Sequence, residues 1–173
     1  MLLSHRTSVK IRPEYSNIIG HMCYAASKLW NICNYERRHY KELGLEKYPD
    51  WYYQKKAHKG NLWYKQLPSQ TAQETCKQLD KAWKSFYVLK KTGGIKDPNP
   101  PRFKQDNIPV TYMQMGIRHE KGSDRLRLSL PKGLKSYMEE TYGIHERFLY
   151  LENKIFRDID PVSYTHLTLP TIA

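Results

Sequence analysis

Basic side chains are concentrated in the middle of this 173-residue chain. Positions 77 to 104 hold eight Lys or Arg residues and only two acidic ones, Asp80 and Asp97. Ammonium and guanidinium groups at this density can neutralise successive phosphates of a nucleic acid, although a solvated lysine surface is the simpler alternative. The eight basic residues are Lys77, Lys81, Lys84, Lys90, Lys91, Lys96, Arg102 and Lys104.

A helix between Pro68 and Lys91 is predicted to position these lysines. Leu67-Pro68-Ser69 is a typical helix start, and Gly93-Gly94 supplies a stop. Apolar residues follow at spacings of 4, 3, 4 and 3, namely Ala72, Cys76, Leu79, Trp83 and Phe86. At about 100° per residue, one set of lysines falls roughly opposite this stripe. The set consists of Lys77, Lys81, Lys84 and Lys91.

Aromatic residues also alternate with basic ones at residues 51–56 and 63–65. Such a mixture can stack bases while it neutralises the backbone of a single strand. The alternative is that these rings pack the core of a small helical region.

Patterns typical of catalysis or metal binding are missing from the sequence. It has no nucleophile motif, no glycine-rich phosphate loop and no carboxylate pair that specifies acid–base work. The three cysteines match no metal or redox spacing, and Cys33 and Cys76 fall on predicted apolar helix faces. We therefore expect buried structural thiols, no catalytic residue, no metal site and no cofactor in this chain.

The remaining periodicities predict an α+β fold. Strands are expected at 7–12, 108–117, 125–130 and 148–151, and further helices at 14–43, 50–59 and 134–142. The proline-rich stretch 97–101 marks a boundary between them. This order indicates a β-rich module, residues 1–12 and 105–160, interrupted by a helical insertion over residues 13–104.

The last thirteen residues, 161–173, contain no Asp, Glu, Lys or Arg in a chain that is 27% charged. We interpret this segment as a non-native tail, because its composition changes so abruptly. The alternative is a genuine threonine-rich terminus.

The bulk charge favours a polyanionic partner, since the formal net charge is +12 and the isoelectric point is about 9.5. No apolar run approaches the roughly 20 residues that a membrane-spanning helix requires, and the N-terminus does not match a secretory signal. A cytoplasmic protein that does not bind membranes is expected.

Several stretches, in order, resemble the N-terminal part of TnpB-type (OrfB-family) transposon-encoded RNA-guided nucleases, relatives of the type V CRISPR effectors. The resemblance covers about residues 7 to 133 and is most specific in the third helix and the turn after it. The matching stretches are Val9-Lys10-Ile11-Arg12-Pro13, Leu29-Trp30-Asn31, Leu67-Pro68-Ser69-Gln70, Leu79-Asp80-Lys81-Ala82-Trp83-Lys84-Ser85-Phe86-Tyr87, Pro101-Arg102-Phe103-Lys104 and Leu128-Ser129-Leu130-Pro131-Lys132-Gly133.

The resemblance implies a small split β-barrel, or wedge-like module, with an inserted helical recognition lobe. These parts would hold a guide RNA and the target DNA, with sequence read mainly by base pairing. The start of the third helix would face the DNA motif beside the target, which nominates Ser69, Gln70 and Gln73; helix capping and exposed polar surface are the alternative. The full set of expected nucleic-acid-binding residues is Ser69, Gln70, Gln73, Lys77, Lys81, Lys84, Lys91, Arg102 and Lys104.

The chain departs from the family in one important respect. Members of the family continue into a RuvC-like domain, whose acidic residues hold divalent metal ions, and into a four-cysteine zinc element. Neither pattern occurs here, so we expect a truncated, monomeric fragment that binds nucleic acid without cleaving it. The rival hypotheses are a stand-alone DNA-binding regulator or transposon accessory protein, and a module whose charge only confers solubility.

Overall fold

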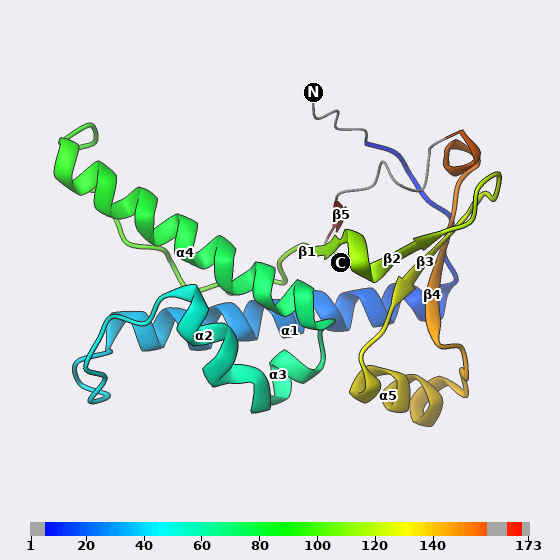
Figure 1. The fold of residues 1–173 in the computed structure, drawn as a ribbon, viewed down its shortest axis with the longest axis horizontal. Helices are drawn as coiled ribbons and strands as arrows, with labels where there is room; N and C mark the ends of the chain where they lie inside the picture. Colours follow the sequence, from blue (N-terminus) through cyan, green and yellow to red (C-terminus); the bar gives the residue numbers. More distant parts are fainter. Residues whose placement is uncertain (1–5, 159–165, 171–173) are drawn as a thin grey trace.

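The computed structural model describes residues 6–158 and 166–170, and it shows a mixed α+β fold (Figure 1). The α-helices are α1 (Pro13–Arg38), α2 (Trp51–Ala57), α3 (Leu62–Lys65), α4 (Ser69–Thr92) and α5 (Lys132–Tyr142). The strands are β1 (Val110–Met113), β2 (Ile117–His119), β3 (Arg125–Ser129), β4 (Phe148–Glu152) and β5 (His166–Leu169). Short 3₁₀ turns occupy His58–Gly60, Gln114–Gly116 and Lys154–Arg157.

Helix α1 is the longest helix described; α3 and α4 pack along it, and α2 packs against α4 and reaches α1 through the side chain of Gln54 (Figure 1). Helix α1 begins with Pro13, a favoured residue in the first helical turn. The predicted end near Leu43 is wrong, because the helix stops at Arg38 and turns follow as far as Gly44. Arg37 is the last residue of α1 that is buried, and Leu43 is half exposed, so no apolar contact extends the helix further.

The prediction of α4 is confirmed. The side chain of Ser69 does not cap the helix, because the N-cap position belongs to Pro68. At the other end Gly93 has a φ of 66°, a left-handed conformation that suits glycine, and its N–H donates to the carbonyl of Leu89. Figure 1 shows α4 diverging from α1 toward this end.

The strands form two small antiparallel sheets, with the orders β1-β5 and β2-β3-β4. Neither sheet closes into a barrel among the residues that the structure describes, so the expected split barrel is not observed there. The single strand predicted over 108–117 is wrong, because the 3₁₀ turn Gln114–Gly116 separates β1 from β2. A Cβ at Gly116 would lie 3.0 Å from the ring of Tyr112, so the chain turns back closely at this point.

The strand predicted over 7–12 is reduced to one bridge, in which Lys10 and Glu152 exchange backbone hydrogen bonds of 2.9 and 3.0 Å. Val9 and Ile11 still pack against the core, so the predicted alternation of the side chains is retained. Part of the segment 161–173 forms β5, which pairs with β1, and residues 161–165 and 171–173 lie outside the described residues.

One hydrophobic core joins the helical region to the strands. It contains Leu29 of α1, Leu79 of α4, Tyr112 of β1, Leu128 of β3 and Leu134 of α5, all fully buried. The helical insertion therefore shares its core with the β module and is held rigidly against it. Within the described ranges, no helix has the combination of length and apolar character that crossing a membrane requires.

The expected burial of the thiols is confirmed. Cys33 on α1 and Cys76 on α4 are buried, and their Sγ atoms lie 3.9 Å apart where the two helices cross. The hydrogen bond between the two thiols, together with burial, leaves Cys33 with a pKa well above its ordinary value. These groups pack the helix interface as small apolar residues do.

Candidate nucleic-acid interface

The lysine face of α4, which we define as Lys77, Lys81, Lys84 and Lys91, lies on the side of the helix turned away from α1. Lys81, Lys84 and Lys91 are exposed, as the helical wheel predicts. Lys77 is half-buried, and its Nζ lies 5.8 Å from the centroid of the Trp51 ring on α2. The four side chains thus share a face, but α2 covers one edge of it.

Lys84 differs from its neighbours because it is already paired. Its Nζ lies 2.7 Å from Oδ2 of Asp80, one turn earlier on the same helix. Asp80 is buried and also accepts a hydrogen bond of 2.9 Å from Arg37 of α1. Across residues 6–158 and 166–170, Lys81 and Lys91 have no such ion pair, so their charges are more available to a ligand.

A buried polar network holds α2 and α4 against α1 and so orients the lysine face. Arg37 donates to Oδ1 of Asp80 and, through Nε, to Oε1 of Gln54 at 2.8 Å. Gln54 in turn donates to the carbonyl of Cys33 and to Glu36. The buried guanidinium therefore has partners from α2 and α4, which fixes how those two helices sit on α1. The sequence patterns gave no sign of this network, because its members are far apart in the chain.

The segment 101–104 runs along α1 and is fixed to it by side chains of that helix. Asn34 donates to the carbonyl of Pro101 at 2.9 Å, and Trp30 Nε1 donates to the carbonyl of Arg102 at 3.1 Å. Asn31 donates to the carbonyl of Lys104 at 2.8 Å and accepts from its backbone N–H at 2.7 Å. The backbone is thus held at three of the four residues.

Because its carbonyls face α1, this segment presents its charged side chains to solvent. Arg102 and Lys104 are exposed, and neither forms an ion pair with a described residue. The Nζ of Lys104 lies 4.7 Å from the centroid of the Trp30 ring, and Arg38 lies 4.9 Å from the ring of Phe103. Sequence reasoning named Arg102 and Lys104, but it missed the α1 residues that hold them.

A hollow of about 380 Å³ connects the segment 101–104 with α4. Lys104 and Gln78 lie on its walls, so it adjoins the lysine face of α4 at one edge. Lys104 is the one cation among its lining residues. Its lining residues are Trp30, Gln78, Lys104, Ile108, Pro109, Thr111 and Thr168.

The three polar residues predicted at the start of α4 lie together, but apart from Lys91. Gln73 donates to Oγ of Ser69 at 3.3 Å, and Gln70 donates to Sδ of Met115 at 3.0 Å. At about 1.5 Å per residue, the 22 steps along the helix from Ser69 to Lys91 span roughly 33 Å. The predicted residues therefore form a long line and not a compact pocket, a shape that suits an extended polymer.

Neither the scan against protein-family models nor the search of curated proteins finds a match for this chain. What the interface can bind is therefore inferred from the arrangement of its residues. It offers two exposed lysines of α4, Lys81 and Lys91, that have no ion pair among the described residues, and two more exposed cations on the segment 101–104 that α1 holds in place. This arrangement can hold phosphates by charge at several points along a strand.

Proposed function

We propose that this chain is a nucleic-acid-binding fragment of a transposon-associated RNA-guided DNA endonuclease, holding guide RNA and target DNA in the cytoplasm. One observation carries the binding proposal. Lys81, Lys91, Arg102 and Lys104 are exposed cations without a carboxylate partner among the described residues, and they lie on a rigid helix and a pinned segment. The identification of the ligands as a guide RNA and its target DNA rests on the family resemblance.

The physical basis is the release of counterions. Each cation that replaces a condensed counterion at a phosphate makes binding more favourable, by an amount that decreases as salt rises. The rigidity of α4 adds to this, because its lysines lose no backbone freedom on binding. Ser69, Gln70 and Gln73 would then contact base edges at the start of the helix, where glutamine can pair in two places with adenine.

The test compares lysines on different faces of the same helix. We expect Lys81→Ala and Lys91→Ala each to lower the slope of log affinity against log salt by about one unit, for both structured RNA and duplex DNA. Lys90→Ala is the matched control, because this exposed lysine lies outside the lysine face, and it should leave the slope unchanged. Lys84→Ala should have less effect than Lys81→Ala, since Asp80 already compensates Lys84.

Equal slopes for Lys81→Ala and Lys90→Ala would remove the lysine face from the interface. A dimer in light-scattering measurements, together with preference for a duplex with two spaced half-sites, would favour the stand-alone regulator. The proposal assigns binding and not cleavage to this chain, so we expect no cut DNA when Mg²⁺ is added to the complex. A magnesium-dependent cut by the purified chain would contradict that part of the proposal.

A further inference from the structure

The outer face of the β2-β3-β4 sheet carries arginine and aromatic side chains that the proposed function does not use. The inner face is apolar: Leu128 of β3 is paired with Ile117 of β2 and Leu149 of β4, and all three are buried. Because side chains alternate along a strand, the next pairs point outward. They place Arg127 opposite both Arg118 and Tyr150.

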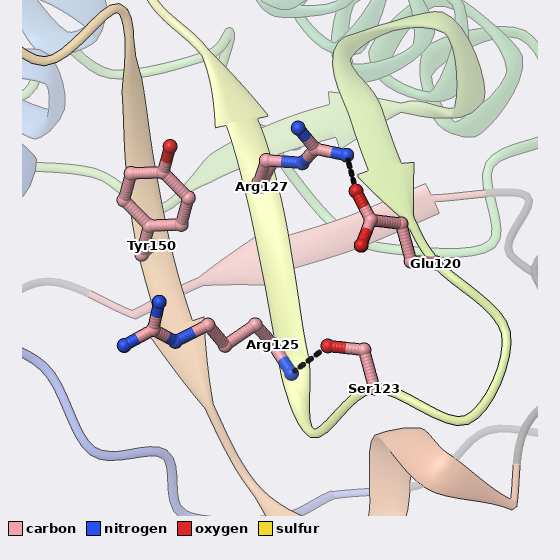
Figure 2. A pocket seen from close by; sticks show the side chains of 5 residues that line it. All are labelled: Glu120, Ser123, Arg125, Arg127 and Tyr150. Atoms are coloured by element: carbon pink, nitrogen blue, oxygen red, sulfur yellow. Dashed lines mark hydrogen bonds and ion pairs between the residues drawn. The ribbon is translucent and has the colours of Figure 1, made fainter.

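A hollow of about 200 Å³ lies on this outer face (Figure 2). It is smaller than the clefts of about 300 Å³ and more that enclose small-molecule ligands, so it suits one flat group and not a whole cofactor. Figure 2 shows Tyr150 on β4 beside the two arginines of β3, with Glu120 and Ser123 on the other side. These five residues line it: Glu120, Ser123, Arg125, Arg127 and Tyr150.

Both arginines of β3 lie near an aromatic ring and near a carboxylate. The guanidinium of Arg125 is 5.9 Å from the Tyr150 ring centroid, and Nε of Arg125 is 2.8 Å from Oε1 of Glu152. Arg127 forms an ion pair with Glu120 and lies 5.8 Å from the ring of Phe148. The sheet therefore places aromatic rings, which can stack on a base, beside guanidinium groups, which can bind a phosphate.

The pairing of Arg118 with Arg127 also calls for an anionic ligand. Like charges directly opposite one another on adjacent strands destabilise a sheet. A phosphate bound to Arg127 in the hollow would reduce that repulsion, whereas the carboxylate of Glu120 compensates only one of the two arginines.

We propose that this hollow binds one nucleotide of a single-stranded nucleic acid, with its base stacked on Tyr150 and its phosphate held by Arg125 and Arg127. The inference rests on the proposed function, because it assigns a second contact to the same class of ligand. Stacking is available to any base, so the site selects an unpaired strand over a duplex. The ion pairs with Glu120 and Glu152 must open for the phosphate to enter, so these carboxylates oppose binding.

The experiment measures the affinity of the full chain for a short fluorescent oligouridine, a matched oligodeoxythymidine and an RNA hairpin. Tyr150→Leu should weaken binding of one or both single strands by roughly 5- to 150-fold, the range typical of losing one stacked base. Tyr150→Phe keeps the ring and is the matched control, so it should bind as the unaltered chain does. The oligonucleotide that is more affected identifies whether the strand is RNA or DNA.

A carboxylate variant separates a binding role from a structural one. Glu120→Gln should raise the affinity for the single strand, because it frees Arg127, while Arg127→Ala should lower it. If the Glu120–Arg127 pair only stabilised the sheet, the two substitutions would not change the affinity in opposite directions. Circular dichroism and thermal melting check that each variant folds.

The outcomes also distinguish this inference from the function on which it rests. If Lys81→Ala lowers binding of the RNA hairpin while Tyr150→Leu and Tyr150→Phe bind the oligonucleotides equally, the sheet site is refuted and the helix interface stands. If neither the oligonucleotides nor the hairpin bind, both proposals fail. An unaltered chain that binds the hairpin but no single strand also overturns the inference.

Discussion

At the scale of single residues, the buried ion pair between Arg37 and Asp80 is a point at which one substitution should strongly affect stability. Their side chains are 1% and 5% exposed, and the two charged atoms lie 2.9 Å apart. Removing one partner of a buried pair leaves the other charge without compensation in a medium of low polarity. The consequence for stability is therefore larger than for any exposed pair in this chain.

We expect Asp80→Ala to lower the free energy of unfolding by about 3–5 kcal/mol. Urea denaturation at neutral pH measures it. Lys84→Ala removes the exposed partner of the same carboxylate and should cost less than about 1 kcal/mol. Similar losses of unfolding free energy in the two variants would show that the Arg37–Asp80 pair contributes little to stability.

The same carboxylate should make stability depend on pH in the acid range. Burial alone would raise the pKa of Asp80, but hydrogen bonds from Lys84 and Arg37 outweigh it and hold the pKa below its ordinary value of 3.8. A lowered folded-state pKa stabilises the protein above the unfolded-state pKa, and this stabilisation is lost as pH falls through the folded-state value. Glu36 has a lowered pKa as well: burial opposes the shift, and hydrogen bonds from His58 and Gln54 produce it.

We therefore expect the unfolding free energy to fall as pH is lowered below about 4, and to fall less steeply in Asp80→Asn. Denaturant titrations at a series of acidic pH values measure both slopes. Identical slopes for the two proteins would mean that the pKa of Asp80 is the same in the folded and unfolded states.

At the scale of elements, Asn31 of α1 controls whether the segment 101–104 stays attached. Its side chain accepts from the backbone N–H of Lys104 and donates to the carbonyl of the same residue. We expect Asn31→Ala to speed hydrogen exchange at the Lys104 amide and to weaken nucleic-acid binding, while the amides of α4 remain protected. An exchange rate at Lys104 that does not change would show that Asn31 is not what holds the segment.

At the scale of the whole molecule, the pairing of β5 with β1 closes the structure between distant parts of the chain. Leu169 of β5 pairs with Val110 and is 4% exposed, and the carbonyl of Pro170 accepts a hydrogen bond from Cys23 of α1. We expect Leu169→Ala to reduce the unfolding free energy by about 2–5 kcal/mol, measured by denaturant titration. Thr168→Ala, at an exposed position of the same strand, should cost much less. Equal effects would mean that β5 does not contribute to the core.

Local patterns predicted the elements whose residues face a single environment. The spacing of Ala72, Cys76, Leu79 and Trp83 predicted α4 and its buried side, and the alternation of arginine and leucine predicted β3. That alternation also contained the signal for the outward arginines of the sheet, which sequence reasoning left out of the candidate site. The residues that pin 101–104 gave no signal, because their partners are backbone carbonyls about seventy positions away.

The sequence by itself determined the positive charge, the faces of the helices and the order of helix and strand, because these depend on neighbouring residues and a fixed backbone period. Only the tertiary structure decided that Asp80 is buried and bonded to Arg37 of another helix. It likewise decided that β1 and β2 belong to separate sheets with no barrel among the described strands. Pairing of this kind depends on which distant segments the shared core brings together, and no local period contains that information.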